Sequence, residues 1–197
     1  MYNTADQANL SVVGHVKITD VDTQQVLLDK FNAINFENMA ISIVNLLANQ
    51  TDSNGNGFFI TKMIFGDGGT IIDTNGNISY RTPNVDGSQG ALYEDEVGPN
   101  GATFEKSITE FVISDDSGQQ YRDLTSVCVL DYNDPADALA VDNSTQIGEN
   151  GTEYVFDELA LVADNGNLLT HLIFHPIQKS LNRKLEVRYT LRIRAGS

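Results

Sequence analysis

The sequence predicts a single, mainly β domain of the α+β class: an antiparallel β-sandwich with one packed α-helix over residues 36–49. Three observations predict this fold. Residues 12–19 alternate between apolar and polar side chains, which is the period of a half-buried strand. Residues 36–47 carry an apolar stripe at helical spacing. From Phe58 onward the patterns are those of strands and loops, and 197 residues suit one ordinary domain.

The chain is expected to begin with a β-hairpin over residues 10–31. Its first strand is "SVVGHVKITD", in which one set of alternate positions is largely apolar. "DVDTQQ" has the composition of a polar turn, and "VLLDKF" has that of the returning strand. The two strands are therefore expected to pair antiparallel.

The helix is expected in "NFENMAISIVNLLANQ". Asn35 is placed to cap its N-terminus, and Glu37 lies in the first turn, where the helix dipole favours an anion. "TDSNGNG" then ends the helix with turn-forming residues. The side chains that share the apolar stripe, and that we expect to pack on the sheet, are Phe36, Met39, Ala40, Ile43, Leu46 and Leu47.

The remainder of the chain reads as strands separated by turns. The expected strands are "GFFITKMIF", "TFEKSITEFVISD", "YRDLTSVCVLDY", a hairpin within "YVFDELALVADNGNLLTHLIFHP" that turns at residues 164–166, and "KLEVRYTLRIR". Two loop-rich insertions interrupt them at about residues 73–103 and 131–153. All 197 residues are assigned to one domain.

The charge of the chain is strongly acidic and unevenly placed. The formal net charge is −15, which argues against non-specific nucleic-acid binding, because that binding needs basic side chains on the phosphates. Residues 179–197 nevertheless hold six of the twelve basic residues and a single acid. In the last strand Arg188, Arg192 and Arg194 share one face, which makes them a candidate assembly interface for acidic partners. The alternative interpretation is a solvated basic strand face.

The chain has none of the sequence signals that place a protein in or across a membrane. No run approaches the roughly 18 apolar residues that span a bilayer. "MYNTADQANL" lacks the basic start and apolar core of a signal peptide, so we expect synthesis in the cytoplasm. Cys128 is the single cysteine; "LTSVCVLDY" offers it no cationic partner, and a small buried residue is expected there.

A glycine turn in "ITKMIFGDGGT" raises the question of a nucleotide site. A phosphate loop needs a GxxxxGK[ST] or GxGxxG pattern that opens a helix. Here "TIIDTNGNISY" follows, no lysine is present, and Asp67 would repel a phosphate. Gly66, Gly68 and Gly69 are therefore interpreted as a structural turn that ends a strand, with the positive φ that glycine permits.

A calcium loop is also considered. "DSNGNG" begins like one at Asp52, but the residue at position 12 is Met63 instead of a bidentate glutamate. The related stretches "DTNGN" and "DNGN" suggest that this chain uses such turns repeatedly.

Histidine and carboxylate pairs complete the chemical candidates. His171 and His175 have the spacing of zinc ligands on a helix, but in a strand they lie about 13 Å apart, too far to share one metal ion. His15 stands alone. Asp157 and Glu158 are adjacent, so in a strand they point to opposite faces and form a poor acid–base pair. We therefore predict no catalytic, cofactor-binding or metal site, and no enzyme activity.

The order of the segments resembles the N-terminal module of phage tail-collar fibre proteins and related virion proteins of tailed bacteriophages. That family shows a helix, a strand ending in a "GDG" turn, a short "L-x-x-E" stretch and a "REIGL-x-D-x-x-G-x-L" hairpin before a last strand. The matching positions are Gly66–Asp67–Gly68, Leu92 with Glu96, Asp157–Glu158–Leu159, and Gly166 with Leu168. The likeness covers about residues 36–194. This chain departs from the family in its additional hairpin over residues 10–31, and no collar or fibre shaft is expected.

The resemblance implies a structural role in a tailed-phage particle. The expected function is a tail, baseplate or neck component that assembles in multiple copies, with other virion proteins and copies of itself as partners and with no nucleic acid or membrane. A head decoration protein is the first alternative. The second is a carbohydrate-binding or polysaccharide-cleaving β module, which the absence of tryptophan disfavours.

Overall fold

The computed structural model describes residues 9–87, 91–93, 104–114, 118–135, 154–180 and 182–196. The first sheet, called sheet I, contains β1 (Asn9–Asp20), β2 (Val26–Phe31), β8 (Glu110–Ile113), β9 (Tyr121–Leu130) and β12 (Leu185–Gly196). The second, called sheet II, contains β3 (Ala33–Ile34), β4 (Ile60–Gly66), β7 (Phe104–Ser107), β10 (Tyr154–Ala163) and β11 (Thr170–Lys179). A separate hairpin is formed by β5 (Thr70–Ile72) and β6 (Ile78–Tyr80), and the helix α1 covers Phe36–Leu47.

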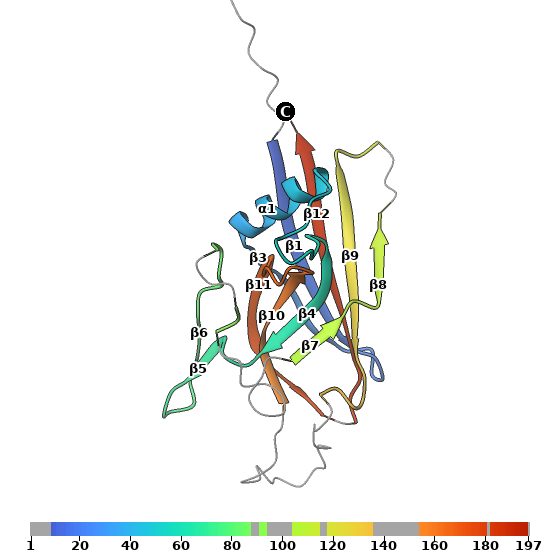
Figure 1. The fold of residues 1–197 in the computed structure, drawn as a ribbon. Helices are drawn as coiled ribbons and strands as arrows, with labels where there is room; N and C mark the ends of the chain where they lie inside the picture. The colour runs from blue at the N-terminus through green and yellow to red at the C-terminus, as the bar shows by residue number, and fades with distance from the viewer. Residues whose placement is uncertain are drawn as a thin grey trace, which may run out of the picture.

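The sheets are antiparallel and pack face to face, as Figure 1 shows. The strand order is β2-β1-β12-β9-β8 in sheet I and β3-β11-β10-β4-β7 in sheet II. The core between them is formed by inward side chains of both sheets: Val16, Ile18, Cys128, Leu130, Val187, Tyr189 and Leu191 from sheet I, and Met63, Phe65, Phe156, Leu159, Leu161, Leu172 and Phe174 from sheet II. The prediction of a mainly β sandwich with one helix is confirmed.

The first and last strands of the chain lie side by side in sheet I. β1 pairs antiparallel with β2 and, on its other side, with β12 along its whole length. In β12 the odd-numbered side chains from Leu185 to Leu191 are buried and the even-numbered ones are not. Period-2 patterning was therefore sufficient to assign the faces of this strand.

Helix α1 is placed correctly by the sequence, but the predicted buried stripe is partly wrong. The Asn35 side chain caps the helix by accepting a hydrogen bond from the Asn38 N–H at 3.1 Å. The buried helical residues are Asn38, Met39 and Ser42, and Ile43 is half-buried. The other expected core side chains are exposed: Phe36, Ala40, Leu46 and Leu47. The helix thus buries two polar residues beside Met39, and Asn38 donates a hydrogen bond to the Leu168 carbonyl of the sandwich at 2.9 Å.

The predicted single strand in "TFEKSITEFVISD" is divided between the two sheets. The Ile108 N–H donates to the Thr61 carbonyl of sheet II at 3.0 Å, and the next N–H, of Thr109, donates to the Val127 carbonyl of sheet I at 2.8 Å. The chain therefore crosses the sandwich edge between these residues. An alternating pattern fits either sheet equally, so it gave no sign of the crossing.

The two expected insertions are only partly covered by the described residues. The first contains β6 and the end of the β5–β6 hairpin, which projects from the sandwich on the side opposite β8 (Figure 1). The rest of that insertion, apart from residues 81–87 and 91–93, lies outside the described residues, as do residues 136–153 of the second.

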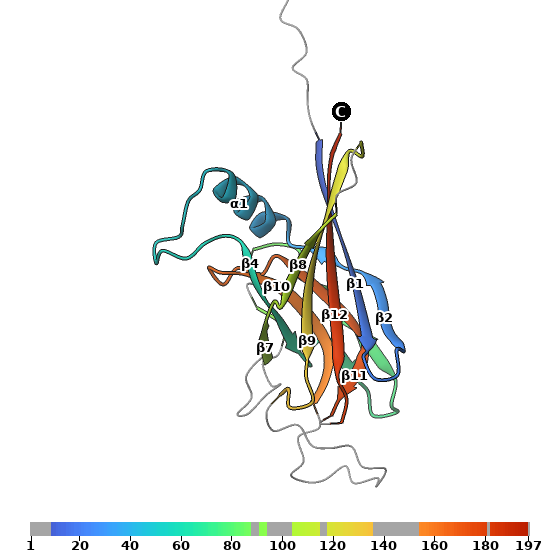
Figure 2. The ribbon, with the colours of Figure 1, turned by 90° about the vertical axis from the view of Figure 1, so that its right-hand side faces the viewer.

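One end of sheet I extends past sheet II. Figure 2 shows the upper parts of β1, β12 and β9 rising above the sandwich, with α1 set beside them at an angle. This end holds large exposed apolar side chains, among them Leu10 of β1 and Ile113 of β8. Within the described ranges, the structure has no helix of the length and apolar character that crossing a membrane requires.

Candidate functional site

The glycine turn after β4 is held by the carboxylate of Asp157 on β10. Asp157 accepts hydrogen bonds from the backbone N–H groups of Gly69 and Thr70, both at 2.8 Å, and a short one from the Thr70 hydroxyl. Burial raises the pKa of Asp157 above its ordinary value, and the hydrogen bonds from Thr70 and Gly69 only partly offset this. Ionisation therefore costs folding free energy, and the contribution of Asp157 to stability falls as the pH rises through its raised pKa.

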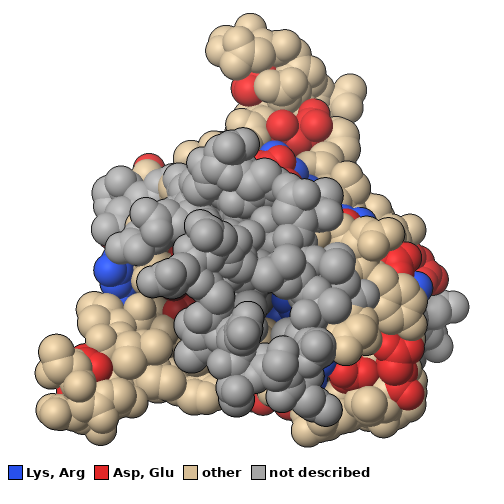
Figure 3. Space-filling view, turned by 90° about the horizontal axis from the view of Figure 1, so that it is seen from below, with Lys and Arg blue, Asp and Glu red and all other residues tan. Residues whose placement is uncertain are grey.

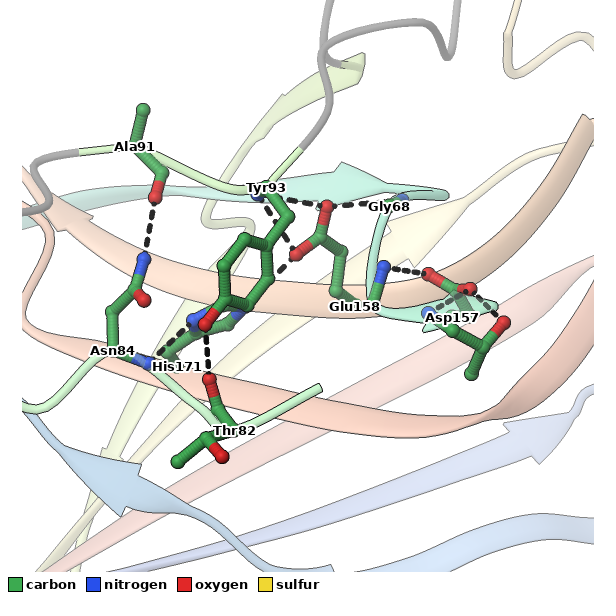
Figure 4. Close-up of polar contacts among 10 residues, drawn as sticks. Gly68, Thr82, Asn84, Ala91, Tyr93, Asp157, Glu158 and His171 are labelled. Atoms are coloured by element: carbon green, nitrogen blue, oxygen red, sulfur yellow. Dashed lines mark hydrogen bonds and ion pairs between the residues drawn. The ribbon is translucent and has the colours of Figure 1, made fainter. Parts of the chain in front are cut away.

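Glu158, the next residue, binds the same turn and a second segment. Its carboxylate accepts hydrogen bonds from the Gly68 N–H at 3.2 Å and from the Tyr93 N–H at 3.1 Å (Figure 4). Glu158 is completely buried. The pairing of β10 with β11 is interrupted between Phe156 and Glu158, beside the part of β11 that contains Pro176. Proline cannot donate to the ladder, which is consistent with the break at this point.

Glycine is required in this turn for space and not for backbone conformation. A Cβ atom on Gly66 would lie 2.6 Å from a carboxylate oxygen of Glu158, its cross-strand partner. A Cβ atom on Gly69 would lie 2.9 Å from the Asp157 carbonyl oxygen. The predicted structural turn is present, but the expected positive φ is wrong, since the described glycines with positive φ are Gly55, Gly76, Gly118 and Gly166.

His171 on β11 completes the buried cluster with a defined tautomer. Its Nδ1 lies 3.0 Å from the backbone nitrogen of Asn84, and its Nε2 lies 3.0 Å from the Glu158 carboxylate. Because a backbone N–H can only donate, Nδ1 must accept, and the ring proton is carried by Nε2, which donates to Glu158. Both side chains are fully buried.

The cluster fastens the described part of residues 81–93 to the sandwich. Besides the bonds from Asn84 and Tyr93, the Asn84 side chain donates to the Ala91 carbonyl at 2.9 Å. The centroids of the Tyr93 and His171 rings lie 5.7 Å apart. The Arg81 guanidinium also contacts Tyr93, at 4.9 Å from its ring centroid. Figure 4 shows Asn84, Ala91 and Tyr93 converging on Glu158 and His171.

The glycine turn uses its backbone N–H groups as a phosphate loop does, but they bind carboxylates of the protein itself. Backbone N–H groups of a glycine turn converge on negative charge, as they do on a bound phosphate. Here the negative charge comes from the protein's own Asp157 and Glu158, so the donors are already occupied. A buried histidine–carboxylate pair without exposure to solvent has no access to a substrate. The geometry therefore supports an anchoring role.

The remaining chemical candidates lie apart from one another. His15 contacts Asp29 at 2.6 Å on the outer face of sheet I, and His175 is exposed and contacts the Tyr80 hydroxyl at 3.2 Å. Cys128 is fully buried, and burial raises the pKa of its thiol to about 12. In the described ranges no three His, Cys, Asp or Glu side chains gather as metal ligands do.

The stretch that resembles a calcium loop forms a closed Asx turn. One oxygen of Asp52 accepts the N–H groups of Asn54 and Asn56, each at 2.8 Å. Asp73 repeats the same pattern with Asn75 and Asn77 in the β5–β6 hairpin. The sequence interpretation of recurrent turns agrees with these contacts.

The three arginines of the candidate interface have partners within the chain. Arg192 binds Asp123 through two hydrogen bonds of 2.8 Å, and the hydrogen bond from Arg192 lowers the pKa of Asp123. Arg188 lies 3.4 Å from Glu186. The Arg194 guanidinium lies 6.0 Å from the ring centroid of Tyr121. The face is therefore largely neutralised at Arg188 and Arg192, and the role of all three in assembly stays a prediction.

The same neutralisation applies at the opposite end of β12. Arg183 binds Asp20 at 2.7 Å, and Lys184 lies 3.6 Å from Asp131. Figure 3, seen from below, shows acidic side chains at several places on this face, with basic ones next to some of them. Lys179 is buried and donates to the Ser180 carbonyl, and burial lowers its pKa to about 8. Four of the six basic residues in this run, Arg183, Lys184, Arg188 and Arg192, thus pair with acids of the chain itself.

A large apolar surface surrounds α1, and we call it the apolar end. Its members are exposed side chains of α1, of its neighbours in sheet I and of the segment before β4: Leu10, Phe36, Val44, Leu46, Leu47, Phe59, Phe111 and Ile113. Phe36 is 69% exposed, Leu47 85% and Ile113 70%. An exposed apolar surface of this extent is typical of an interaction site.

Two apolar grooves lie within this surface, one on each side of α1. One, of about 450 Å³, lies between α1 and the start of β1 and includes Leu10, Phe36 and Val44. The other, of about 240 Å³, lies on the opposite side of α1 and includes Phe59 and Phe111. Met39 and Ile43 line both grooves.

Comparisons of this chain with protein-family models, curated proteins and solved structures find no match. The likeness to phage tail-collar fibre proteins therefore stays a prediction.

Sequence reasoning missed both main features of the site. It treated Asp157 and Glu158 only as an unsuitable acid–base pair, whereas the structure brings both to the glycine turn. The available signal was the presence of two acids in the otherwise apolar strand "YVFDELALVA". The apolar end was missed because the stripe on α1 was assigned to the core.

Proposed function

We propose that the protein is a non-enzymatic structural component of a tailed-bacteriophage particle, located in the tail, baseplate or neck and present in multiple copies. The observation that carries the proposal is the apolar end, where large side chains on α1, β1 and β8 lie exposed around two grooves. Such a surface is costly in water for an isolated domain and is stabilised when another protein covers it.

The buried polar cluster supports the same proposal. Asp157, Glu158 and His171 have the residue types of an active site, but their hydrogen bonds join parts of the chain to one another. Acid–base catalysis requires a group that can reach the substrate proton, and these buried groups are occupied by backbone donors. The order of segments that resembles phage tail-collar fibre proteins then selects a virion component among assembly proteins.

The proposal is tested on particles made by a phage that carries this gene. Purified particles are separated into heads and tails, and the protein is detected in each fraction by peptide mapping. We expect it in the tail fraction with several copies per particle, and we expect a deletion to give incomplete tails. Detection with the heads would favour a decoration protein. Complete, infectious particles without the protein would contradict a structural role.

A further inference from the structure

We propose that β8 is a self-pairing edge: two copies of the chain align β8 antiparallel about a two-fold axis at Val112 and bring their apolar ends together. The proposal deepens the proposed function and rests on it for its biological setting, because multi-copy assembly requires contacts between copies or with neighbours. Its structural basis is independent of that setting.

The outer backbone edge of β8 is open within the described ranges, where sheet I ends at this strand. Ser114 donates its N–H to the Asp123 carbonyl of β9 at 2.9 Å. Because antiparallel pairs alternate, Glu110, Val112 and Ser114 direct their backbone groups toward β9, and Phe111 and Ile113 direct theirs outward. Each copy thus offers two N–H and two C=O groups.

The sequence of β8 is complementary to itself in this register. With Val112 opposite its own copy, Phe111 lies opposite Ile113, and the outward groups of these two residues form four hydrogen bonds across the axis. Glu110 lies opposite Ser114, so that like charges do not face each other. Apolar cross-strand pairs of this kind stabilise a sheet, and a register shifted by one residue would lose both complementarities.

Natural edge strands are usually protected by lysine, proline or a bulge. β8 has the sequence EFVI, its four residues are all exposed, and its pairing with β9 is regular over Glu110–Ile113. The neighbouring edge strand of sheet II, β7, carries Glu105 and Lys106. The contrast between the two edges on the same side of the sandwich distinguishes β8 as the one suited to pairing.

The apolar end supplies the area that four hydrogen bonds alone would not. Phe111 lines the groove beside α1, and Ile113 lies on the same face of β8. The apolar end has eight large side chains, most of them at least half exposed. Phe111 and Ile113, which lie on β8 itself, are 48% and 70% exposed and are the side chains nearest the axis, so pairing covers them first. A second copy offers the same apolar surface in return.

The first experiment measures association of the purified full-length chain by analytical ultracentrifugation. We expect a monomer–dimer equilibrium. Ile113→Lys places a charge beside Phe111 of the other copy and should raise the dissociation constant by about 100-fold or more. The matched control is Ile72→Lys, which changes an equally exposed isoleucine on the β5–β6 hairpin across the molecule and should leave the constant unchanged. Thermal melting confirms that both variants fold.

The second experiment tests the register by oxidative cross-linking. In the proposed dimer the two Val112 side chains face each other at a non-hydrogen-bonded position, so Val112→Cys should form an intermolecular disulfide efficiently. Glu110→Cys is the control, because the two introduced thiols would be about 13 Å apart. The native Cys128 is buried and does not compete.

The outcomes separate this proposal from the proposed function. A monomer at about 100 µM, or a dimer that Ile113→Lys leaves intact, overturns self-pairing through β8. Equal cross-linking at positions 110 and 112 overturns the register. If the chain is monomeric but Val112→Cys cross-links to a different protein in particles, β8 pairs with another virion protein. In each case the presence of the protein in tails is decided separately by fractionation.

Discussion

The cluster around Glu158 and the apolar end around α1 are opposite in character: one buries polar groups and the other exposes apolar ones. In the cluster, polar groups are buried, and each carboxylate is surrounded by donors from the chain itself. At the apolar end, large hydrophobic side chains are exposed, while the inward face of α1 buries the polar Asn38 and Ser42 beside Met39. The first region is complete within one molecule, and the second is completed by contact with another. Residue type alone would have suggested that the histidine and carboxylates form the functional site and that the apolar side chains form the core.

The largest effect on stability is expected from Glu158→Ala. The change leaves the N–H groups of Gly68 and Tyr93 and the Nε2–H of His171 buried without an acceptor, which should lower the free energy of unfolding by about 3–5 kcal/mol. Urea denaturation measures the loss. Glu105→Ala serves as the control, because Glu105 forms an exposed ion pair with Lys62 whose removal should cost less than about 1 kcal/mol. Equal effects of the two variants would show that Glu158 is not an anchor.

A pair of asparagine substitutions tests the reason for the glycines. Gly76 has a φ of 84° and open space around it, and asparagine tolerates that conformation, so Gly76→Asn should cost only about 0.5 kcal/mol. At Gly69 the side chain would collide with Asp157 and Ile173, and Gly69→Asn should cost about 2 kcal/mol. The midpoints of thermal unfolding give both values. If Gly76→Asn proves the more harmful, backbone conformation and not space governs these turns.

The ion pair between Asp123 and Arg192 gives a pH-dependent effect of smaller size. The hydrogen bond from Arg192 lowers the pKa of Asp123 from its ordinary value of 3.8, so the pair stabilises the fold above that pH and loses its effect as the pH falls through the lowered pKa. Asp123→Asn should therefore cost up to about 1 kcal/mol at pH 7, because solvent screens the half-exposed Arg192. The difference from the wild type should disappear in strong acid; a constant difference at all pH values would contradict the assignment.

The smallest effect on folding is expected at the apolar end. Leu47→Gln changes a side chain that is 85% exposed and should leave the free energy of unfolding within about 0.5 kcal/mol of the wild type. Met39→Ala, on the buried side of the same helix, should cost about 2 kcal/mol or more. Denaturant titrations of the two variants measure the difference. A strongly destabilised Leu47→Gln would show that this part of α1 belongs to the core.

The regular elements were predictable because their patterns are local. Alternation identified β1 and the faces of β12, and the cap at Asn35 located the start of α1. The anchoring cluster depends largely on contacts between segments far apart in the sequence, such as Gly69 with Asp157, 88 positions away, and Tyr93 with Glu158, 65 positions away, which no local pattern contains. The prediction of which face of α1 is buried was partly wrong for a related reason. Periodicity shows which helix side chains share a face, but not whether a sheet or another protein covers that face.

The single thiol of this protein can report how often the folded structure opens. Cys128 lies near the end of β9, in the core between the two sheets, with no solvent exposure, and burial raises the pKa of its thiol to about 12, so an aqueous disulfide reagent cannot attack it in the closed molecule. The rate of its modification therefore reports how often the sandwich separates, without any introduced label. If association through the apolar end restrains that separation, the rate of modification will fall as the protein concentration rises. The concentration dependence of the absorbance change from the reagent then measures the strength of assembly.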